Sequence, residues 1–510
     1  MSNKKWFTWV LLLLSVSLAA AAEDVAMRGC RRGTPRQHPS LTRTTQQTRQ
    51  PGGDFYQGER HQLVVLAAFN DRSFKGDEAA TLSLWNNIFN TPGYQDKKFQ
   101  GSVHDYFYDQ SYGKFDLTFD LHYVQLADNC KKYRSTQKDD ENSQYLVQDV
   151  MDQLEKLDID WSLYDWNGDG YVNQLIILFA GMSMHDGGDD NSIWSHQWWL
   201  SDHMKDRTSE YCEPRTITNS HDGHTYTVDC YCALAELSGR DDYGSFGTIC
   251  HEYTHCFGFP DFYGNIATPR QWDLMDFGNN NGDGFRPCGY SAHERWLMGW
   301  LSPEELSDAA TINQMSALAE QPQAYLVRND AYAKEYYIIE NRQQRDWDAS
   351  LPSSGIVIFH VDYDPDVWRS VTSSPNCYSV NYASNRNRYT IIPANNSLLS
   401  ILSRGWSYPY GNNNQLTDTS VPAALLIHEN GEGTKLMGKP ITMMNVTNGL
   451  ASFQFMSDSV TLVSSQQETA GEGAVQVFDL SGRPVSEPKP GQLCLVRSAG
   501  GIIRKQLLKK

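Results

Sequence analysis

One short segment, residues 250–261, constrains the fold of this 510-residue chain more than any other part of the sequence. It reads CHEYTHCFGFPD, and the histidines His251 and His255 in it are four positions apart. Residues four apart share one face of a helix, so both imidazoles can reach one metal ion. Glu252 stands beside them on the same turn. The segment therefore predicts a helix that carries two metal ligands and a carboxylate base.

A third ligand is expected from the turn that follows this helix. A hydrolytic zinc site has three protein ligands and an open position for water or substrate. Gly258 permits a sharp turn and Pro260 cannot continue a helix, so the chain should leave the helix there. It can then bring Asp261 back towards the metal.

Residues 251–261 read HExxHxxGxxD, and this signature resembles that of the metzincin-like immune inhibitor A family of secreted zinc metallopeptidases. The resemblance covers about residues 62–361. Three further stretches carry it, namely Gly101–Leu117, Trp272–Asp276 and Ala292–Leu301.

The resemblance implies a metzincin-like α/β (α+β) catalytic domain built around an active-site helix. It implies that His251 and His255 bind zinc and that Glu252 is the catalytic general base, acting on a zinc-bound water. Asp261 would be the third zinc ligand, although many metzincins have histidine at this position. His293 or Glu294 are the alternatives for that ligand.

Several neighbours of the motif have expected roles of their own. The resemblance implies that Met275 provides a hydrophobic floor to the metal site without binding the ion. Tyr263 and Tyr290 are candidates for stabilising the oxyanion. Cys250 and Cys256 point away from the zinc face, so we expect them to be buried thiols or disulfide partners.

The rest of the chain predicts where the sheets and helices lie. The apolar runs His61–Phe69 and Asn173–Ala180 are typical of strands buried on both faces. Helices are expected at Glu78–Phe89 and Asn142–Leu157, which together indicate an α/β region. After about Ser302 the pattern changes to short β-rich runs, such as Glu335–Glu340, Gly355–Val361 and Tyr389–Ile392.

The N-terminus is typical of export. Lys4 and Lys5 precede an apolar run, Trp6–Leu18, which is followed by Ala19–Ala22. This is the organisation of a secretory signal peptide; a retained anchor is the alternative. Cys30 follows among arginines that favour a thiolate, so it is a candidate for a cysteine switch that blocks the zinc. A leader cysteine without such a role is the alternative.

The expected organisation is a signal peptide at 1–22, a pro-segment or leader at 23–60, a zinc peptidase domain at 61–302, a β-rich domain at 303–457 and a small all-β tail at 458–510. The tail resembles the sorting domain of the type IX secretion pathway, which implies bacterial secretion machinery as a partner. A small packing module is the alternative.

An acidic loop is a candidate site for a second ion. Asp165, Asn167 and Asp169 place oxygen ligands at alternate positions, as in the start of a calcium loop. Ile176 stands where such a loop needs its twelfth-position glutamate. An ordinary Asp/Asn/Gly turn is therefore an equal alternative. The stretch Asn279–Asp283 is a weaker case.

Charge and hydropathy disfavour two classes of function, nucleic-acid binding and membrane-spanning. The chain has 61 acidic and 43 basic side chains, a net charge of −18, which disfavours nucleic acid as a partner. No long apolar run follows the N-terminus, so no membrane-spanning segment is expected in the mature chain. We expect a secreted or cell-surface zinc endopeptidase that hydrolyses extracellular polypeptides, with the substrate beside an edge strand near Ile193–His196. A catalytically inactive surface adhesin on a protease fold and a non-peptidase zinc hydrolase are the alternatives.

Overall fold

The computed structural model describes residues 55–457 except 97, 135–141, 204–210, 239–242, 245, 265–267, 365–367, 369–378 and 382–386. Of the C-terminal stretch it describes 476–478, 485, 493–497 and 503–507. The expected signal peptide, most of the expected leader and Cys30 lie outside the described residues. Within the described ones, no helix is both long and apolar enough to cross a membrane.

The chain divides into two compact units, one that extends to Phe455 and one that begins at Met456. The described part of the second unit is an antiparallel sheet in the order β18-β19-β20. Its strands are β18 (Gln476–Phe478), β19 (Leu493–Arg497) and β20 (Ile503–Leu507). All other described elements belong to the first unit.

A five-stranded sheet is the scaffold of the N-terminal half of the first unit, in the order β2-β1-β3-β7-β4. Four strands run parallel, and β4 runs antiparallel at one edge. The middle strands are buried along most of their length, as the apolar runs of β1 and β3 predicted for those two. The strands are β1 (Gly58–Ala68), β2 (Phe115–Gln125), β3 (Leu175–Met182), β4 (His196–Trp199) and β7 (Cys230–Leu237).

Helices accompany this sheet, and the predicted mixed α/β fold is confirmed. Asp77 caps the first of them by accepting the N–H of Ala80 over 2.8 Å. The helices of this region are α3 (Glu78–Asn90), α4 (Val103–Gln110) and α5 (Ser143–Leu154), and a hairpin joins β5 (Arg215–Thr218) to β6 (Thr225–Val228). Short 3-10 helices are η1 (Cys130–Tyr133), η2 (Trp161–Tyr164), η3 (Leu200–Asp202), η4 (Arg270–Trp272), η5 (Phe277–Gly284), η6 (Asp346–Ser350) and η7 (Ser400–Gly405).

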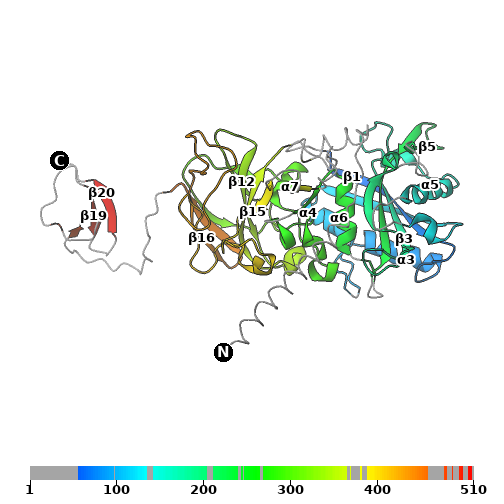
Figure 1. The fold of residues 1–510 in the computed structure, drawn as a ribbon, viewed down its shortest axis with the longest axis horizontal. Helices are drawn as coiled ribbons and strands as arrows, with labels where there is room; N and C mark the ends of the chain where they lie inside the picture. The colour runs from blue at the N-terminus through cyan, green and yellow to red at the C-terminus, as the bar shows by residue number, and fades with distance from the viewer. Residues whose placement is uncertain are drawn as a thin grey trace, which may run out of the picture. The chain divides into compact units, whose positions relative to one another are not determined.

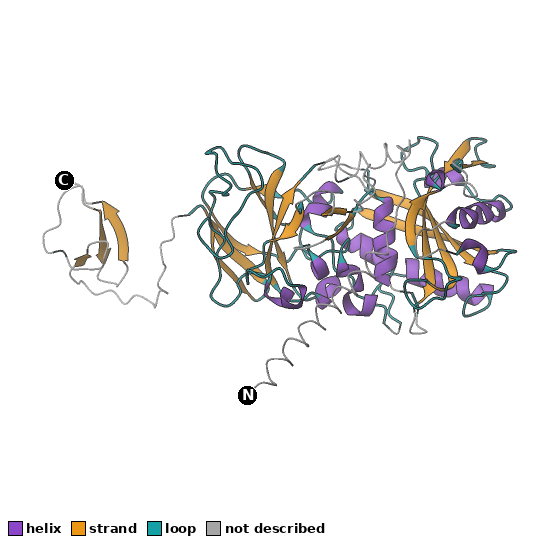
Figure 2. Ribbon diagram, viewed as in Figure 1, coloured by secondary structure: helices purple, strands orange, loops and turns teal. Residues whose placement is uncertain are grey.

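The helix predicted for the motif is α6 (Phe246–Cys256), which contacts β7 and β4. Figure 1 shows it between the first sheet and the sheet that contains β12. In Figure 2, other helical turns gather around it between the two groups of strands. One of these is η5, and another is α7 (Ala292–Leu297), whose first turn has a capping box with Ser291 as N-cap.

The contact between α6 and η5 depends on Gly247. A Cβ atom at this position would overlap the backbone carbonyl of Asn279, which cannot rotate away as a flexible side chain can. We therefore expect Gly247→Ala to lower the free energy of unfolding by about 1–3 kcal/mol. Thermal unfolding followed by circular dichroism measures the loss. Gly431→Ala is the matched control, because a Cβ there has no atom within 4 Å; equal stability of the two variants would contradict the prediction.

The C-terminal half of the first unit is β-rich, as predicted. It contains a five-stranded sheet in the order β15-β13-β12-β11-β9 and a three-stranded sheet in the order β10-β17-β16. The strands are β9 (Glu304–Glu305), β10 (Ala310–Met315), β11 (Tyr325–Arg328), β12 (Glu335–Arg342), β13 (Gly355–Asp362), β15 (Tyr389–Ile391), β16 (Ile441–Thr447) and β17 (Leu450–Phe455).

Strand β12 joins two hydrophobic cores. Tyr336 and Ile338 belong to the core that also contains the first sheet and α6. Tyr337 and Ile339 point to the other face and belong to a second core, shared with the three-stranded sheet. Because both faces of β12 are buried, its middle residues, 336–339, are all apolar or aromatic. The β-rich half is therefore packed directly against the half that carries the motif.

Glu335 at the start of β12 gives this half a predictable response to acid. Its carboxylate is buried and accepts hydrogen bonds from His360 (2.8 Å) and from the backbone N–H groups of Ile427 (2.5 Å) and His428 (3.0 Å). Burial would raise the pKa of Glu335, but these contacts outweigh it and lower the pKa from 4.5 to about 2. The ionised form is thus favoured by folding, which stabilises the chain above about pH 4.5 and ceases to do so as the pH falls towards 2.

We expect Glu335→Gln to destabilise the chain most near neutral pH, and the difference from wild type to shrink as the pH falls below about 4.5. Urea unfolding at several pH values between about 3 and 7 measures this difference. Glu432→Gln, at an exposed position, controls for the change in net charge. A difference that does not vary with pH would contradict the prediction.

Candidate metal centre

The two histidines of the motif lie one turn apart on α6, with their ring centroids 4.8 Å apart. Both are buried, His251 at 4% exposure and His255 at 0%. The helix ends where the sequence predicted. Gly258 has a φ of 87°, which favours glycine, and its N–H donates to the carbonyl of His255 over 2.8 Å. The chain therefore turns directly after the second histidine.

The turn brings Asp261 back to both histidines. Its Oδ1 atom lies 3.3 Å from Nε2 of His251 and 3.1 Å from Nε2 of His255. The ligand atoms of these three buried residues lie within 4.8 Å of one another. Among the described residues, no other group of three histidine, cysteine, aspartate or glutamate side chains converges in this way.

A strand from the β-rich half supports the carboxylate. Asp261 begins β8 (Asp261–Gly264), which pairs in parallel with β14 (Ser379–Asn381). The side-chain N–H of Asn381 donates to the carbonyl of Phe262 over 2.5 Å. A segment more than a hundred residues further along the chain thus holds the strand that positions Asp261.

Hydrogen bonds fix the orientation of both imidazoles. Nδ1 of His251 lies 2.9 Å from the carbonyl of Leu274, and Nδ1 of His255 lies 2.7 Å from the carbonyl of Phe259. A carbonyl only accepts hydrogen bonds, so each Nδ1 carries a proton and donates it. With Nδ1 as the donor to a carbonyl, Nε2 is the ring atom that faces Asp261 and is left to bind a metal ion.

The donor set fits zinc. Tyr263 donates its hydroxyl to Oδ2 of Asp261 over 2.8 Å, whereas Oδ1 is buried and accepts no hydrogen bond from the described residues. Two Nε2 lone pairs and one carboxylate oxygen, all buried and facing each other, need a positive charge among them. Zinc prefers nitrogen and oxygen ligands of this kind and commonly takes three from the protein.

The pKa values of His251 and Asp261 also indicate that the site favours a positive charge. Burial would lower the pKa of His251, but contact with Asp261 and the charge of Glu252 raise it to about 9. Burial would raise the pKa of Asp261, but the charges of His255 and His251 lower it well below its usual value. The site therefore holds positive charge strongly, whether as a proton or as a metal ion.

The turn around Met275 connects the first histidine to the third residue of the group. The carbonyl of Leu274 accepts the Nδ1 proton of His251, and the carbonyl of Met275 accepts the N–H of Phe262 over 2.7 Å. The N–H of Met275 donates to Asp273 over 2.8 Å. Met275 itself is fully buried in the main core. One turn therefore positions both α6 and β8.

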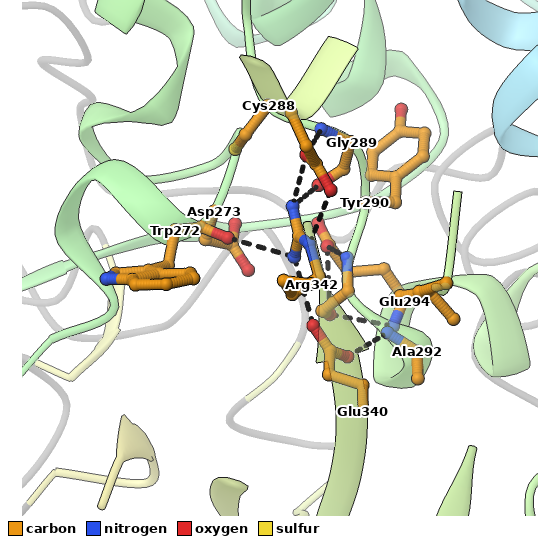
Figure 3. A network of polar contacts seen from close by, with 12 residues as sticks. Trp272, Asp273, Cys288, Gly289, Tyr290, Ala292, Glu294, Glu340 and Arg342 are labelled. Carbon is orange, nitrogen blue, oxygen red and sulfur yellow. Dashed lines mark hydrogen bonds and ion pairs between the residues drawn. The ribbon is translucent and has the colours of Figure 1, made fainter. Parts of the chain in front are cut away.

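A buried arginine from the β-rich half supports this turn (Figure 3). Arg342 of β12 forms two hydrogen bonds to the carboxylate of Asp348, over 2.6 and 2.7 Å, and one to Glu340 over 3.0 Å. It also donates to the carbonyls of Trp272 (3.4 Å) and Gly289 (3.0 Å). Trp272 begins the turn, so Arg342 ties the turn to the second sheet.

The structure places the other catalytic candidates on or beside α6. Glu252 follows His251 on the helix and is buried at 4% exposure. Tyr263 contacts Asp261 through its hydroxyl. Tyr290 is fully buried, and its hydroxyl is hydrogen-bonded to the hydroxyl of Thr254 on α6. Tyr290 thus supports the back of the helix.

His293 and Glu294, the alternative third ligands, do not face the two histidines of the motif. His293 is buried among aromatic rings, and its Nδ1 lies 3.4 Å from the hydroxyl of Tyr336. Burial lowers the pKa of His293 to about 3. Glu294 accepts the N–H of Ser291 over 2.7 Å as part of the helix cap. Neither joins the group of converging ligand atoms, so Asp261 is the acidic residue that the fold brings to the two histidines.

Cys250 and Cys256, which flank the ligands on α6, are buried free thiols. Cys130, Cys212, Cys230, Cys232 and Cys288 are buried as well. The thiols therefore contribute to packing, as expected from their positions on the helix.

The acidic loop after η2 is closed by its own hydrogen bonds. The carboxylate of Asp165 accepts the N–H groups of Asp169 (3.1 Å) and Gly170 (2.8 Å). The amide of Asn167 donates to Asp169 over 3.0 Å. These are the contacts of an Asp/Asn turn, and calcium binding here stays a prediction.

Sequence reasoning missed the residues that orient the ligands. The carbonyls of Leu274 and Phe259 have no signal in the sequence, because every residue has a carbonyl. The hydrogen bond of Tyr263 to Asp261 has a weak signal, since a tyrosine two residues from a ligand on a strand shares its face. Asn381 and Arg342 lie too far along the chain for any spacing rule.

Comparisons with known proteins relate the chain to a peptidase family. Residues 63–299 match the family described as immune inhibitor A peptidase M6, catalytic domain. A protein named immune inhibitor A, from Bacillus thuringiensis subsp. alesti, is 29% identical over 149 residues. That alignment covers 26% of this chain and 20% of the relative, so the chain spans about a fifth of the relative's length. The family match supports a peptidase and suggests a metal in its catalytic domain.

Proposed function

We propose that this chain is a zinc-dependent endopeptidase in which His251, His255 and Asp261 bind the metal. The observation that carries the proposal is the convergence of three buried ligand atoms on one point next to α6. The match of residues 63–299 to a peptidase catalytic domain supports it. The chain's own hydrogen bonds to both Nδ1 atoms support it as well, because they hold the rings in the ligand tautomer.

When bound, zinc lowers the pKa of a water molecule and polarises the carbonyl of the scissile peptide. Glu252 is the group that handles protons. It accepts a proton from the attacking water and passes it to the leaving amine. Asp261 would neutralise part of the metal charge. The hydrogen bond of Tyr263 to Oδ2 leaves Oδ1 of Asp261 to bind the metal.

The substrate would lie along β4. This strand is at the edge of the first sheet, where its described neighbour is β7 alone, and it contacts α6. An extended peptide can add to such an edge through backbone hydrogen bonds, with alternate side chains directed towards the protein. The edge strand predicted near Ile193–His196 is thus represented by β4 (His196–Trp199).

Export is part of the proposal. Residues 1–22 would direct secretion, and a leader that begins at residue 23 would be removed, with Cys30 as the candidate zinc-blocking thiol. The expected leader boundary at residue 60 is too late, because Phe55 and Tyr56 are buried in the main core and β1 begins at Gly58. The second unit would serve as the sorting domain recognised by bacterial secretion machinery, and its described part is a small antiparallel sheet. The mature enzyme would act on extracellular polypeptides.

Zinc content and cleavage, measured together on the chain without residues 1–54, test the function; this truncation keeps the core residues Phe55 and Tyr56 and all of β1. We expect one zinc per chain by elemental analysis and internal cleavage of an unstructured protein such as casein. A chelator should stop the cleavage, and added zinc should restore it. One zinc without cleavage would favour the inactive adhesin, and a folded chain that takes up no zinc would overturn the proposal.

A further inference from the structure

A row of hydrogen-bonded side chains connects the turn around Met275 to the start of α7. Oδ2 of Asp273 lies 3.0 Å from the hydroxyl oxygen of Tyr389, which lies 2.7 Å from the hydroxyl oxygen of Ser291. The hydroxyl oxygen of Ser291 lies 3.0 Å from Oε2 of Glu294. All four residues are 0% exposed. We call these four residues the buried bridge.

The buried bridge needs one proton more than its two hydroxyl groups supply. Its three contacts between oxygen atoms have hydrogen-bond lengths, so each needs a proton between the two oxygens. Tyr389 and Ser291 each bring one hydroxyl proton, whereas an ionised carboxylate can only accept. The third proton therefore belongs to one of the two carboxyl groups at the ends of the bridge.

The other contacts of the two carboxyl groups leave a place for this proton on Asp273. Its Oδ1 accepts the N–H of Met275 over 2.8 Å, whereas its Oδ2 contacts Tyr389. At the other end, Oε2 of Glu294 accepts the N–H of Ser291 over 2.7 Å, and Oε1 is buried and accepts no hydrogen bond from the described residues. With a proton on Oδ2 of Asp273, each hydroxyl can donate to the next group along the bridge, so all three contacts become hydrogen bonds.

The carboxyl groups of the bridge have no ion pair within the described part of the chain. Arg342, which interacts with Asp273, is already paired with Asp348 and Glu340. Arg295 of α7 donates to two backbone carbonyls and to Gln110. Two ionised carboxylates in the bridge would therefore be buried without a cation of their own, which is unfavourable. The remaining titratable groups that interact with either end of the bridge are Asp276, Cys288, Tyr290 and Tyr106.

The pKa values of both carboxyl groups agree with a bound proton. Burial raises the pKa of Asp273 to about 7, although its hydrogen bonds and Arg342 lower it, and the charge of Asp276 raises it further. Burial and the charge of Asp273 raise the pKa of Glu294 well above 4.5. The folded chain thus binds this proton more tightly than the unfolded chain. Its stability should therefore decrease as the pH rises from about 4 through about 7.

We propose that the two carboxyl groups of the buried bridge share one proton, and that this proton holds the turn around Met275 in place. Asp273 is then a positioning residue. Its carboxyl group accepts the N–H of Met275, and the carbonyl of the adjacent Leu274 accepts the Nδ1 proton of His251. When the proton is lost, two negative charges face each other across the bridge, and the turn should loosen. The effect on the metal rests on the proposed function, whereas the shared proton does not.

Asp273→Asn, made in the chain without residues 1–54, tests the proton. The amide keeps an oxygen for the N–H of Met275 and donates an N–H to Tyr389 at every pH, so it replaces the protonated carboxyl group. Urea unfolding between about pH 4 and pH 8 gives the equilibrium constant of unfolding. In wild type this constant should increase with pH by up to about 10-fold more per pH unit than in the variant, because unfolding releases one proton. Asp308→Asn, at an exposed position, is the matched control and should follow wild type.

Infrared spectroscopy and zinc titration test the proton and the turn separately. At about pH 6, below the pKa of Asp273, wild type should show the C=O band of a protonated carboxyl group that Asp273→Asn lacks. Asp273→Ala also loses the acceptor of the Met275 N–H, so its zinc affinity should fall about 10-fold, whereas Asp273→Asn should bind zinc as tightly as wild type.

Three results would overturn the shared proton: equal pH slopes of wild type and Asp273→Asn, the same carboxyl band in both, or an Asp273→Asn chain that folds at no pH. Equal zinc affinities of Asp273→Ala and Asp273→Asn would overturn the positioning role. A wild type that unfolds with the expected pH slope but binds no zinc would support the shared proton and overturn the proposed function.

Discussion

Glu252→Ala should lose peptidase activity by about 10²-fold to 10⁴-fold while keeping the fold and the metal. The loss is expected because Glu252 is the acidic side chain next to the ligands on the same helical turn, where it can take a proton from the attacking water. The metal is retained because the three converging ligand atoms belong to other residues. The ratio kcat/KM on a fluorogenic peptide measures the loss, and elemental analysis measures the zinc.

Two further variants separate the base from simple packing. Glu252→Gln keeps the shape of the side chain but cannot accept the proton at neutral pH, so it should be about as inactive as Glu252→Ala. Glu432→Ala, at an exposed position in the β-rich half, should equal wild type. Near-normal turnover by Glu252→Gln would rule out this carboxylate as the base.

Arg342→Met should lower the free energy of unfolding by about 3–5 kcal/mol. Arg342 is 1% exposed, and its removal leaves the carboxylates of Asp348 and Glu340 buried without their cation. It also removes the donor to the carbonyl of Trp272, where the turn that holds His251 begins. Urea unfolding measures the stability, and zinc titration should show weaker binding by the variant.

A surface arginine provides the control. Arg328 pairs with Glu305, but both side chains are partly exposed, so Arg328→Met should cost only about 0–1 kcal/mol. The double variant Arg342→Met/Asp348→Asn should recover part of the loss, because the second substitution removes one of the two uncompensated buried charges. If Arg342→Met is no less stable than Arg328→Met, the buried network does not support the turn.

The sequence predicted the elements whose pattern is local. The apolar run after residue 61 became β1, and the capped helix at Glu78 became α3 within one residue of its expected end. The motif spacing predicted α6, the turn at Gly258 and the approach of Asp261, because each depends on helix periodicity or on the conformation of one residue. These features need no information from distant parts of the chain.

The supporting structure could not be predicted in the same way. The pairing of β14 with β8 and the hydrogen bond of Arg342 to the carbonyl of Trp272 join residues separated by 70 or more positions, and periodicity carries no information about such contacts. For the acidic loop at Asp165, a purely local pattern was also insufficient to predict the function. Its spacing suits both a calcium loop and a plain turn, and its hydrogen bonds are those of a turn, so the pattern alone does not separate the two.

The position of the metal tests the central claim most directly. We predict that crystals of the zinc-loaded chain, measured at the zinc absorption edge, show one strong anomalous peak among Nε2 of His251, Nε2 of His255 and Oδ1 of Asp261. The peak should lie about 2.0–2.2 Å from each atom. A peak bound by His293 or Glu294 instead, or no peak beside α6 at all, would contradict the account.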